Sequence, residues 1–369
     1  MRGWALASLA LMALCGPPAC RARGPAAALT TSPAADLPDP MPRPDGFRRG
    51  ASLGLFVSDP EPAVQQRIYS MLLDEMAATG VTDVELVVRY GQQTVDSPGL
   101  ARRAGLTPDD ALLATVIGAA RARGMRVFLL PIVHVEERAM GVWRGTLAPP
   151  DLERWWADYR AFVLHYARLA EASGAVGMFS VGSELLSLEG EVPRWRALIA
   201  DVRAVYHGQL TYSANWDHYA QVPFWDALDV VGLTAYHELT PIADPDEAAL
   251  VAGWRSWAEA LIAWADARDL RFVFTEIGYP SSAHGAARPW DHREGEHPAL
   301  DLQLRCYRAL YRAWHAEPRL AGLYVWNWFG FGGADDRGYT PRGKPARAVL
   351  ARWFEDSRVG IGVLGEASR

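Results

Sequence analysis

Eight short apolar runs recur along this chain from about residue 49, each separated from the next by a longer stretch. The runs carry few polar residues, which is typical of strands buried on both faces of a parallel sheet. They span residues 52–57, 83–88, 125–133, 175–182, 210–215, 228–236, 271–277 and 321–328. This alternation restricts the chain to folds in which strands and helical segments follow one another.

Most of the stretches between the runs have the periodicity of amphipathic helices. In one of them, Trp155, Tyr159 and Phe162 fall on a single apolar stripe. Another begins with Thr107 and Pro108, which predict a capping hydroxyl followed by a first helical turn. The predicted helices cover residues 61–79, 107–123, 151–172, 193–206, 247–268, 299–316 and 344–355.

Together these units match the size and order of a (β/α)8 barrel, so the expected fold is an α/β, single-domain TIM barrel. The connection at residues 216–227 is short and aromatic, and it is the weakest point of the pattern. A doubly wound open sheet is the alternative. However, no Gly-x-Gly-x-x-Gly follows the first run, as a dinucleotide-binding fold of that class would require.

The N-terminal residues are not expected to belong to the barrel. Residues 1–20 place one Arg before an apolar run that is too short to span a bilayer, which predicts a secretory signal peptide. Cys15 and Cys20 make a lipoprotein signal the alternative, with a lipid tether to a membrane. We therefore expect an exported protein, either secreted or anchored in the cell envelope.

The remaining boundaries follow from composition. Residues 21–48 are rich in Ala and Pro and are interpreted as a linker, residues 49–356 as the barrel, and residues 357–369 as a C-terminal tail. Only Cys306 lies within the barrel, where its position on a predicted helix indicates a small core residue rather than a reactive thiol.

Charge and aromatic content narrow the class of partner. The formal net charge is −6, whereas binding to nucleic acid needs clustered positive charge. The chain holds 15 Trp, more than core packing ordinarily needs, and flat amphipathic rings of this kind also bind sugars or partner surfaces. Six of them, at positions 143, 216, 225, 290, 326 and 328, fall on strand ends or connecting loops, which predicts an aromatic cleft at one end of the barrel.

Catalytic groups of such barrels lie at the carboxyl ends of the strands. Polar and aromatic side chains are concentrated at these positions here, and we take them as candidate substrate-binding residues. They are Arg89, Tyr90, His134, Ser183, Asn215, Trp216, Tyr236 and Trp326, with Trp143 in a loop after the third strand.

Glu184 and Glu276 are the candidate catalytic residues. Each follows or ends an apolar strand, where an unpaired charge facing the core would cost several kcal/mol. They belong to the fourth and seventh strands and so face each other across the barrel mouth. Two carboxyl groups that flank a glycosidic bond can hydrolyse it, one as acid and the other as nucleophile, and the negative neighbour raises the pKa of the acid. The alternative is a structural role, either an ion pair with Arg89 or a helix cap.

At these residues the sequence resembles the clan A glycoside hydrolases, and most closely the family 113 β-mannanase group. The resemblance extends from about residue 50 to 355. The stretches that carry it are TPDDALLATVIGAARARGMRVFLLPIV, the WRG at 143–145, WWADYRAFVLHYARLAE, VGSEL, WRALIADVRAVYHGQLTYSANW, FWDALDVVGLTAY, FTEIGY and GLYVWNW.

The resemblance implies a retaining, endo-acting hydrolase of a β-linked, mannan-type polysaccharide. It implies Glu184 as acid/base, Glu276 as nucleophile, Trp326 as the floor under the reactive sugar and Tyr236 as a hydrogen-bond donor near the nucleophile. Ser183 stands where many clan members have Asn, the residue that binds the sugar 2-hydroxyl, so the identity of the sugar stays open. The alternatives are a β-glucanase or another envelope or exopolysaccharide hydrolase of the clan, and a non-catalytic carbohydrate-binding barrel.

No cofactor is expected, and the spacing of His134, His218 and His237 does not match a metal site. We expect the protein to be a monomer. Its expected partner is a polysaccharide or an oligosaccharide substrate. The polar segment 281–298, which follows the seventh strand, is interpreted as a loop that shapes the cleft, with an unstructured surface loop as the alternative.

Overall fold

A computed structural model describes residues 32–39, 46–55, 61–139, 141–291, 295 and 297–356. The chain divides into two compact units, Met1–Ser32 and Pro33–Arg369, and the fold below is that of the second unit. The predicted signal peptide, most of the predicted linker and the predicted C-terminal tail lie outside the described residues.

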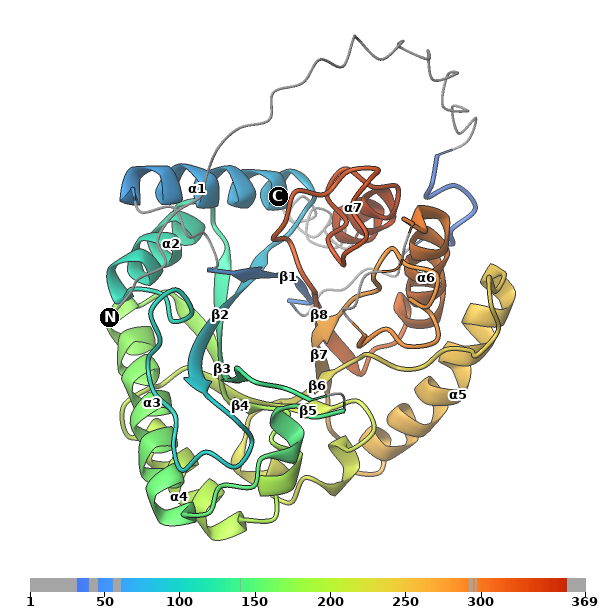
Figure 1. The fold of residues 1–369 in the computed structure, drawn as a ribbon. Coiled ribbons are helices and arrows are strands. Elements are labelled where there is room, and N and C mark those ends of the chain that lie inside the picture. Colours follow the sequence, from blue (N-terminus) through green and yellow to red (C-terminus); the bar gives the residue numbers. More distant parts are fainter. Residues whose placement is uncertain are drawn as a thin grey trace, which may run out of the picture. The chain divides into compact units, whose positions relative to one another are not determined.

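The eight predicted strands form one closed parallel barrel in chain order, with β1 hydrogen-bonded to β8 (Figure 1). This confirms the (β/α)8 TIM barrel. The strands are β1 Arg48–Gly54, β2 Asp83–Gln92, β3 Arg126–Val135, β4 Val176–Ser183, β5 Gln209–Asn215, β6 Val231–Thr234, β7 Phe272–Ile277 and β8 Leu320–Val325.

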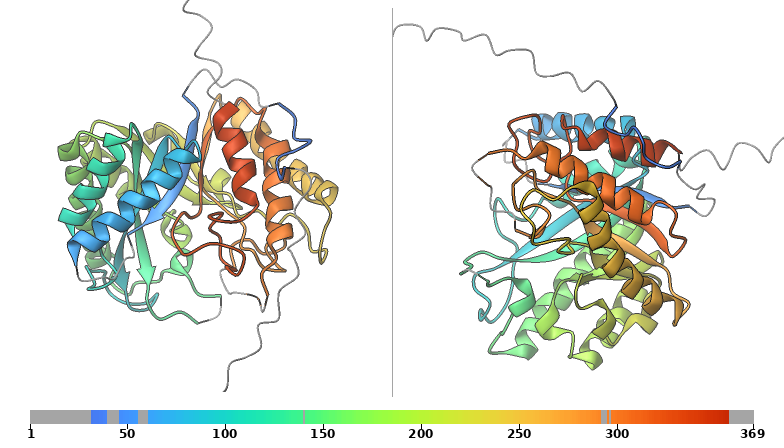
Figure 2. Two further views of the ribbon diagram at one scale, coloured as in Figure 1. Left: turned by 90° about the horizontal axis from the view of Figure 1, so that it is seen from above. Right: turned by 90° about the vertical axis from the view of Figure 1, so that its right-hand side faces the viewer.

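Seven α-helices of the described residues surround the barrel, as Figures 1 and 2 show. They are α1 Pro62–Ala78, α2 Asp110–Ala122, α3 Leu152–Ser173, α4 Val192–Arg203, α5 Glu247–Asp266, α6 Leu300–Trp314 and α7 Ala346–Asp356. The stripe predicted on α3 is buried against the barrel: Trp155 stacks on Tyr159 with ring centroids 4.9 Å apart. Cys306 is a buried residue of α6, as expected.

The connection between β5 and β6, the weakest point of the sequence pattern, holds two short 3-10 helices, Tyr219–Gln221 and Trp225–Ala227. One detail differs from the sequence-based expectation. Thr107 does not cap α2, because the helix begins at Asp110. Its hydroxyl instead donates to the backbone oxygen of Arg89 at 2.6 Å, which ties the loop before α2 to the end of β2.

A separate apolar cluster fills the barrel interior below the carboxyl ends of the strands. Its residues are Val87, Phe128, Leu130, Ile132, Met178, Val273 and Tyr324. This cluster closes the barrel from beneath and leaves the catalytic groups at one end only.

Residues 33–39, within the predicted linker, lie against α6 and α7 (Figure 2). Arg308 of α6 donates to the backbone oxygens of Pro33 and Ala35 at 2.8 Å each, and Arg352 of α7 donates to those of Ala34 and Leu37 at 3.0 Å. This part of the N-terminal segment is therefore docked on the barrel unit. None of the helices in the described part of the chain has the length and apolarity needed to cross a bilayer.

Candidate active site

The two predicted catalytic carboxylates lie at the carboxyl-terminal end of the barrel. Glu184 directly follows β4, and Glu276 is part of β7. Glu184 has a φ of 54°, which is uncommon for a residue other than glycine. Its backbone amide donates to the oxygen of Ser213 at 2.8 Å, and the next amide, that of Leu185, donates to the Tyr212 hydroxyl at 2.8 Å. Strand β5 thus fixes the turn that presents Glu184.

Each carboxylate oxygen of Glu184 has a partner. The hydroxyl of Thr234, at the end of β6, donates to Oε1 at 2.6 Å. A guanidinium nitrogen of Arg144 lies 2.7 Å from Oε2. Arg144 begins the 3-10 helix Arg144–Thr146 in the loop after β3. The Glu184 carboxyl group is thus held between a hydroxyl from the end of β6 and a guanidinium from the loop after β3.

Glu276 is only 3% exposed and has one polar contact within the described chain. The hydroxyl of Tyr236 donates to its Oε2 at 3.0 Å, whereas Oε1 is buried with no hydrogen-bond partner among the residues described. Burial and the negative charge of Glu184 raise the pKa of Glu276 to about 8, against the opposing effects of Arg144 and of the Tyr236 hydrogen bond.

This distribution of charge differs from the sequence-based prediction, which expected the acid Glu184 to have the raised pKa. The structure raises the pKa of Glu276 instead, because Glu276 is buried and lacks a cation of its own, while Glu184 is paired with Arg144. Burial and the charge of Glu184 thus favour a proton on Glu276 near neutral pH.

A third carboxyl group, that of Glu85, lies inside the barrel. It is fully buried on β2, and the hydroxyl of Ser52, its register partner on β1, donates to Oε2. Burial raises the pKa of Glu85 well above the usual range, and the charge of Glu276 adds to the effect. Glu85 therefore contributes a neutral carboxylic acid within electrostatic reach of the site at neutral pH.

Trp326 follows β8 and packs against the apolar cluster inside the barrel, with one part of the side chain still exposed. Gly278 makes this placement possible, since a Cβ at that position would lie 2.3 Å from the backbone oxygen of Trp326. The indole thus covers the barrel interior and faces the same end as the two carboxylates.

Arg89 and His134 are half-buried at the ends of β2 and β3. Burial lowers the pKa of the Arg89 guanidinium to about 10. Burial lowers the pKa of His134 to about 4, and the positive charges of Arg89, Arg138 and Arg144 contribute. At neutral pH, His134 is consequently an uncharged group near these three arginines.

Tyr90 and Trp328 are not brought to the carboxylates, which corrects two expectations. The ring of Tyr90 stacks on Phe162 of α3 at a centroid distance of 4.1 Å, because neighbouring strand residues point to opposite faces and Arg89 occupies the inner one. Trp328 is fully buried and does not line an open cleft.

The other candidates lie at the rim with mixed surroundings. Trp216 is partly exposed and packs against His237 and Trp257, with ring centroids 5.5 and 5.2 Å away. Asn215 donates to Asp217. Trp143 is partly exposed beside Gly145, and Ser183 is buried at the end of β4 with no hydrogen-bond partner for its hydroxyl in the described structure. Their roles toward a substrate remain predictions.

Sequence reasoning missed three residues that shape the site. Arg144 could have been found from the sequence, because it is a charged residue of the WRG triplet in the loop after a predicted strand. Thr234 and Tyr339 gave no signal, because a strand threonine and a loop tyrosine are common. Tyr339 lies between β8 and α7, and its ring meets that of Tyr236 edge to face at 6.1 Å.

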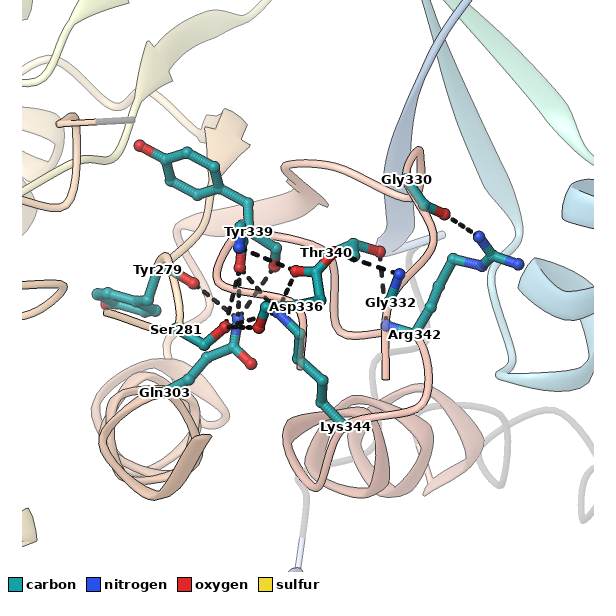
Figure 3. A network of polar contacts seen from close by, with 11 residues as sticks. Tyr279, Ser281, Gln303, Gly330, Gly332, Asp336, Tyr339, Thr340, Arg342 and Lys344 are labelled. Carbon is teal, nitrogen blue, oxygen red and sulfur yellow. Dashed lines mark hydrogen bonds and ion pairs between the residues drawn. The ribbon is translucent and has the colours of Figure 1, made fainter. Parts of the chain in front are cut away.

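A buried polar network holds the segment that carries Tyr339 (Figure 3). The ammonium group of Lys344, whose side chain has no exposed surface, lies 2.7 Å from Asp336 Oδ1 and donates to Ser281 Oγ at 2.7 Å and to the Gly338 oxygen at 2.8 Å. The amide of Gln303 donates to the oxygen of Tyr339 at 3.1 Å. These bonds fix the main chain on both sides of Tyr339 while its ring points away from the network, as Figure 3 shows.

The described residues contain no cluster of three or more His, Cys, Asp or Glu side chains suited to a metal ion.

Comparisons with known proteins agree with this geometry. Residues 63–337 match the profile of Glycoside Hydrolase Family 113. The structure is similar to that of the GH113 β-mannanase AaManA from Alicyclobacillus acidocaldarius, with a TM-score of 0.74 and 29% sequence identity over 84% of this chain and 97% of that one. A GH113 β-1,4-mannanase at 24% identity, with a TM-score of 0.73 over 84% and 99% of the two chains, shares the fold.

A comparison with curated proteins gave no match. Because the family profile covers most of the chain, this protein belongs to Glycoside Hydrolase Family 113 and is a glycoside hydrolase with a barrel similar to those of β-mannanases.

Proposed function

We propose that this protein is a retaining, endo-acting hydrolase of β-1,4-linked mannan-type polysaccharide. Glu184 is the general acid/base and Glu276 is the nucleophile. The observation that carries the proposal is the two buried carboxyl groups at the carboxyl-terminal end of the barrel, with Arg144 and Thr234 on Glu184 and Tyr236 on Glu276. The choice of mannan rests on the similarity to AaManA, a β-mannanase.

The chemistry proceeds in two displacements. In the first, Glu276 attacks the anomeric carbon while Glu184 transfers a proton to the glycosidic oxygen, which leaves with the aglycone. In the second, Glu184 takes a proton from water as the water oxygen attacks the anomeric carbon and releases Glu276. Only the first step starts with a proton on the pair, which Glu184 gives to the leaving oxygen; the second step returns a proton from water to Glu184. Burial of Glu276 and the charge of Glu184 favour retention of that proton near neutral pH.

The proton has to be on Glu184 when the bond breaks. A bound sugar that approaches Glu276 with its electron-poor anomeric carbon stabilises the ionised form of Glu276 and so moves the proton toward Glu184. Tyr236, whose hydroxyl donates to Glu276 Oε2 at 3.0 Å, stabilises the same ionised form. The order of events proposed is therefore substrate binding, proton transfer within the pair, and then glycosyl transfer.

A substrate panel tests the proposal. Wild type, Glu184→Gln, Glu276→Gln and the exposed control Glu259→Gln are assayed on β-1,4-mannan, galactomannan, β-1,4-glucan and mixed-linkage β-glucan. We expect hydrolysis of the mannans by wild type and Glu259→Gln, and loss of about 10²–10⁴-fold or more in the other two variants. Activity confined to glucans contradicts the substrate, and full activity in Glu276→Gln contradicts the nucleophile.

Stereochemistry and products complete the test. Proton NMR during hydrolysis of mannohexaose is expected to show the β-anomer first, as retention requires, and internal cleavage is expected to release di-, tri- and tetrasaccharides together. An α-anomer as first product contradicts the double displacement. Release of one sugar unit at a time contradicts endo action.

We also propose that the protein is exported, on the basis of the apolar segment and the cysteines within residues 1–20. Fractionation of expressing cells, with Cys15→Ala and Cys20→Ala variants, separates the possibilities. A membrane-bound form that becomes soluble in one cysteine variant indicates lipid attachment at that position. A protein found only in the cytoplasm contradicts export.

A further inference from the structure

Strongly exposed apolar side chains gather on the loops that border Glu276. Within the described part of the chain, the large apolar side chains with high exposure are Met71, Ile242, Trp290 and Phe331. Met71 lies on α1, but the other three lie in the loops that follow β6, β7 and β8. These loops lie at the carboxyl ends of the strands, where the catalytic pair is also located.

Trp290 is the exposed side chain with the best-defined support. Its indole is 44% exposed, and its Nε1 donates to Glu238 Oε1 in the loop after β6 at 3.3 Å. The backbone amide of Leu239 donates to the oxygen of Ala286 at 3.0 Å, so the same two loops are joined a second time. The ring is therefore held in place although much of its surface faces solvent.

A direct path of contacts joins Trp290 to the catalytic pair. The hydroxyl of Tyr339 donates to the backbone oxygen of Pro289, the residue before Trp290, at 2.6 Å. On its other side the Tyr339 ring meets Tyr236, whose hydroxyl donates to Glu276. Trp290 is thus linked to Glu276 through two intervening tyrosine side chains.

The polar network around Lys344 explains why this path is rigid. Gln303 and Lys344 fix the main chain at Tyr339 and Gly338, and Ser281, at the start of the loop that carries Trp290, also accepts from Lys344 (Figure 3). One buried centre therefore supports both the loop with Tyr339 and the loop with Trp290. Support of this kind near a solvent-exposed indole suits a preorganised binding surface.

We propose that the indole of Trp290 is the platform for a sugar ring of the β-linked polysaccharide, at a subsite beyond the ring that is being cleaved. The C–H face of a sugar is apolar and matches a flat ring that keeps a polar edge for a hydrogen bond. The occupant is the substrate chain rather than a partner protein because Trp290 lies in a loop at the same end of the barrel as the catalytic pair and is linked to Glu276 through Tyr339 and Tyr236. This inference rests on the proposed function, since it takes a polysaccharide as the substrate.

Chain-length dependence tests the subsite. For Trp290→Ala, we expect KM for mannohexaose to rise about tenfold, the size expected of one aromatic contact, with a smaller rise for mannotriose. Trp290→Phe is expected to recover most of the loss, and Met71→Ala on α1 serves as the matched surface control. Equal increases in KM for both substrates, or no increase for mannohexaose, would overturn the subsite.

A binding measurement separates this inference from the proposed function. Titration calorimetry of mannohexaose into Glu276→Gln, with and without Trp290→Ala, measures affinity without hydrolysis. We expect about tenfold weaker binding in the double variant than in Glu276→Gln. Thermal unfolding shows whether the double variant is folded. Equal affinities of the two folded variants would overturn the platform. Failure of wild type to hydrolyse any mannan contradicts the proposed function instead, and the same titrations then report on Trp290 alone.

Discussion

Replacing Glu276 with Gln is expected to abolish catalysis and yet to stabilise the fold. Burial and the charge of Glu184 raise the pKa of Glu276 from 4.5 to about 8. Between these two pH values the folded chain holds a proton that the unfolded chain has lost, so the free energy of unfolding falls as the pH rises. A neutral amide of the same shape removes this dependence.

The size of the effect follows from the linkage. At pH 7, which lies 2.5 pH units above the unfolded pKa of 4.5, the penalty on the folded state is about 3 kcal/mol. The Gln amide brings a donor that needs a partner, which offsets about 1 kcal/mol of this gain. We therefore expect Glu276→Gln to be about 2–3 kcal/mol more stable at pH 7, a rise in Tm of about 3–5 °C for a domain of this length.

Thermal and urea unfolding of wild type, Glu276→Gln and the exposed control Glu259→Gln at pH 4.5, 6, 7 and 8 measures the effect. The gap between wild type and Glu276→Gln is expected to be near zero at pH 4.5 and to widen up to about pH 8. A Glu276→Gln variant that is no more stable than wild type at pH 7 would refute the reasoning. A gap of constant size across the pH series would refute it as well.

Three further variants test other contacts of the site. Arg144→Met removes the cation that lowers the pKa of Glu276, so the basic limb of the kcat/KM profile is expected to move to higher pH; an unmoved limb contradicts the ion-pair role. Tyr236→Phe removes the hydrogen bond that stabilises the ionised form of Glu276 and is expected to lower kcat/KM about 10- to 100-fold in steady-state assays, whereas a change below about threefold argues against the contact. Lys344→Met removes a fully buried cation and its hydrogen bonds to Ser281 and Gly338, while Asp336 is partly exposed, and is expected to cost about 1.5–3 kcal/mol in urea unfolding. Its control, Arg103→Met, breaks an exposed ion pair and is expected to cost less than about 1 kcal/mol.

The barrel was predictable because its information is local and periodic. Each buried parallel strand leaves an apolar run, and each covering helix leaves a stripe such as the one that Trp155 and Tyr159 share on α3. The two carboxylates were also visible, since a charged residue at the end of an apolar strand needs a reason to be there. Their placement at the ends of β4 and β7 followed from the order of the strands alone.

The errors of the sequence-based prediction arose where the result depended on the direction of a side chain or on the path of the chain in space. Arg89 and Tyr90 are neighbours on β2, so only one can face the barrel interior, and the alternation of a strand argues against assigning both to one site. Trp328 lies near the end of the same strand as Trp326 but is buried. Its burial depends on the path of the chain after β8, which the pattern of apolar residues in the sequence does not reveal. Tyr339 reaches the site through a loop whose course is set by the buried Lys344, and no periodicity in that stretch encodes it.

The location of the shared proton was beyond sequence reasoning for a different reason. Two opposed glutamates predict that one pKa is raised, but which of the two depends on where the cation lies. Arg144 lies on Glu184, and Glu276 is left with a single hydroxyl donor. Burial without a cation of its own thus favours a proton on Glu276, which the proposed mechanism needs ionised when it attacks. Under that mechanism the substrate has to stabilise the ionised form of Glu276, and hydrolysis is thereby coupled to the presence of a sugar ring above Glu276.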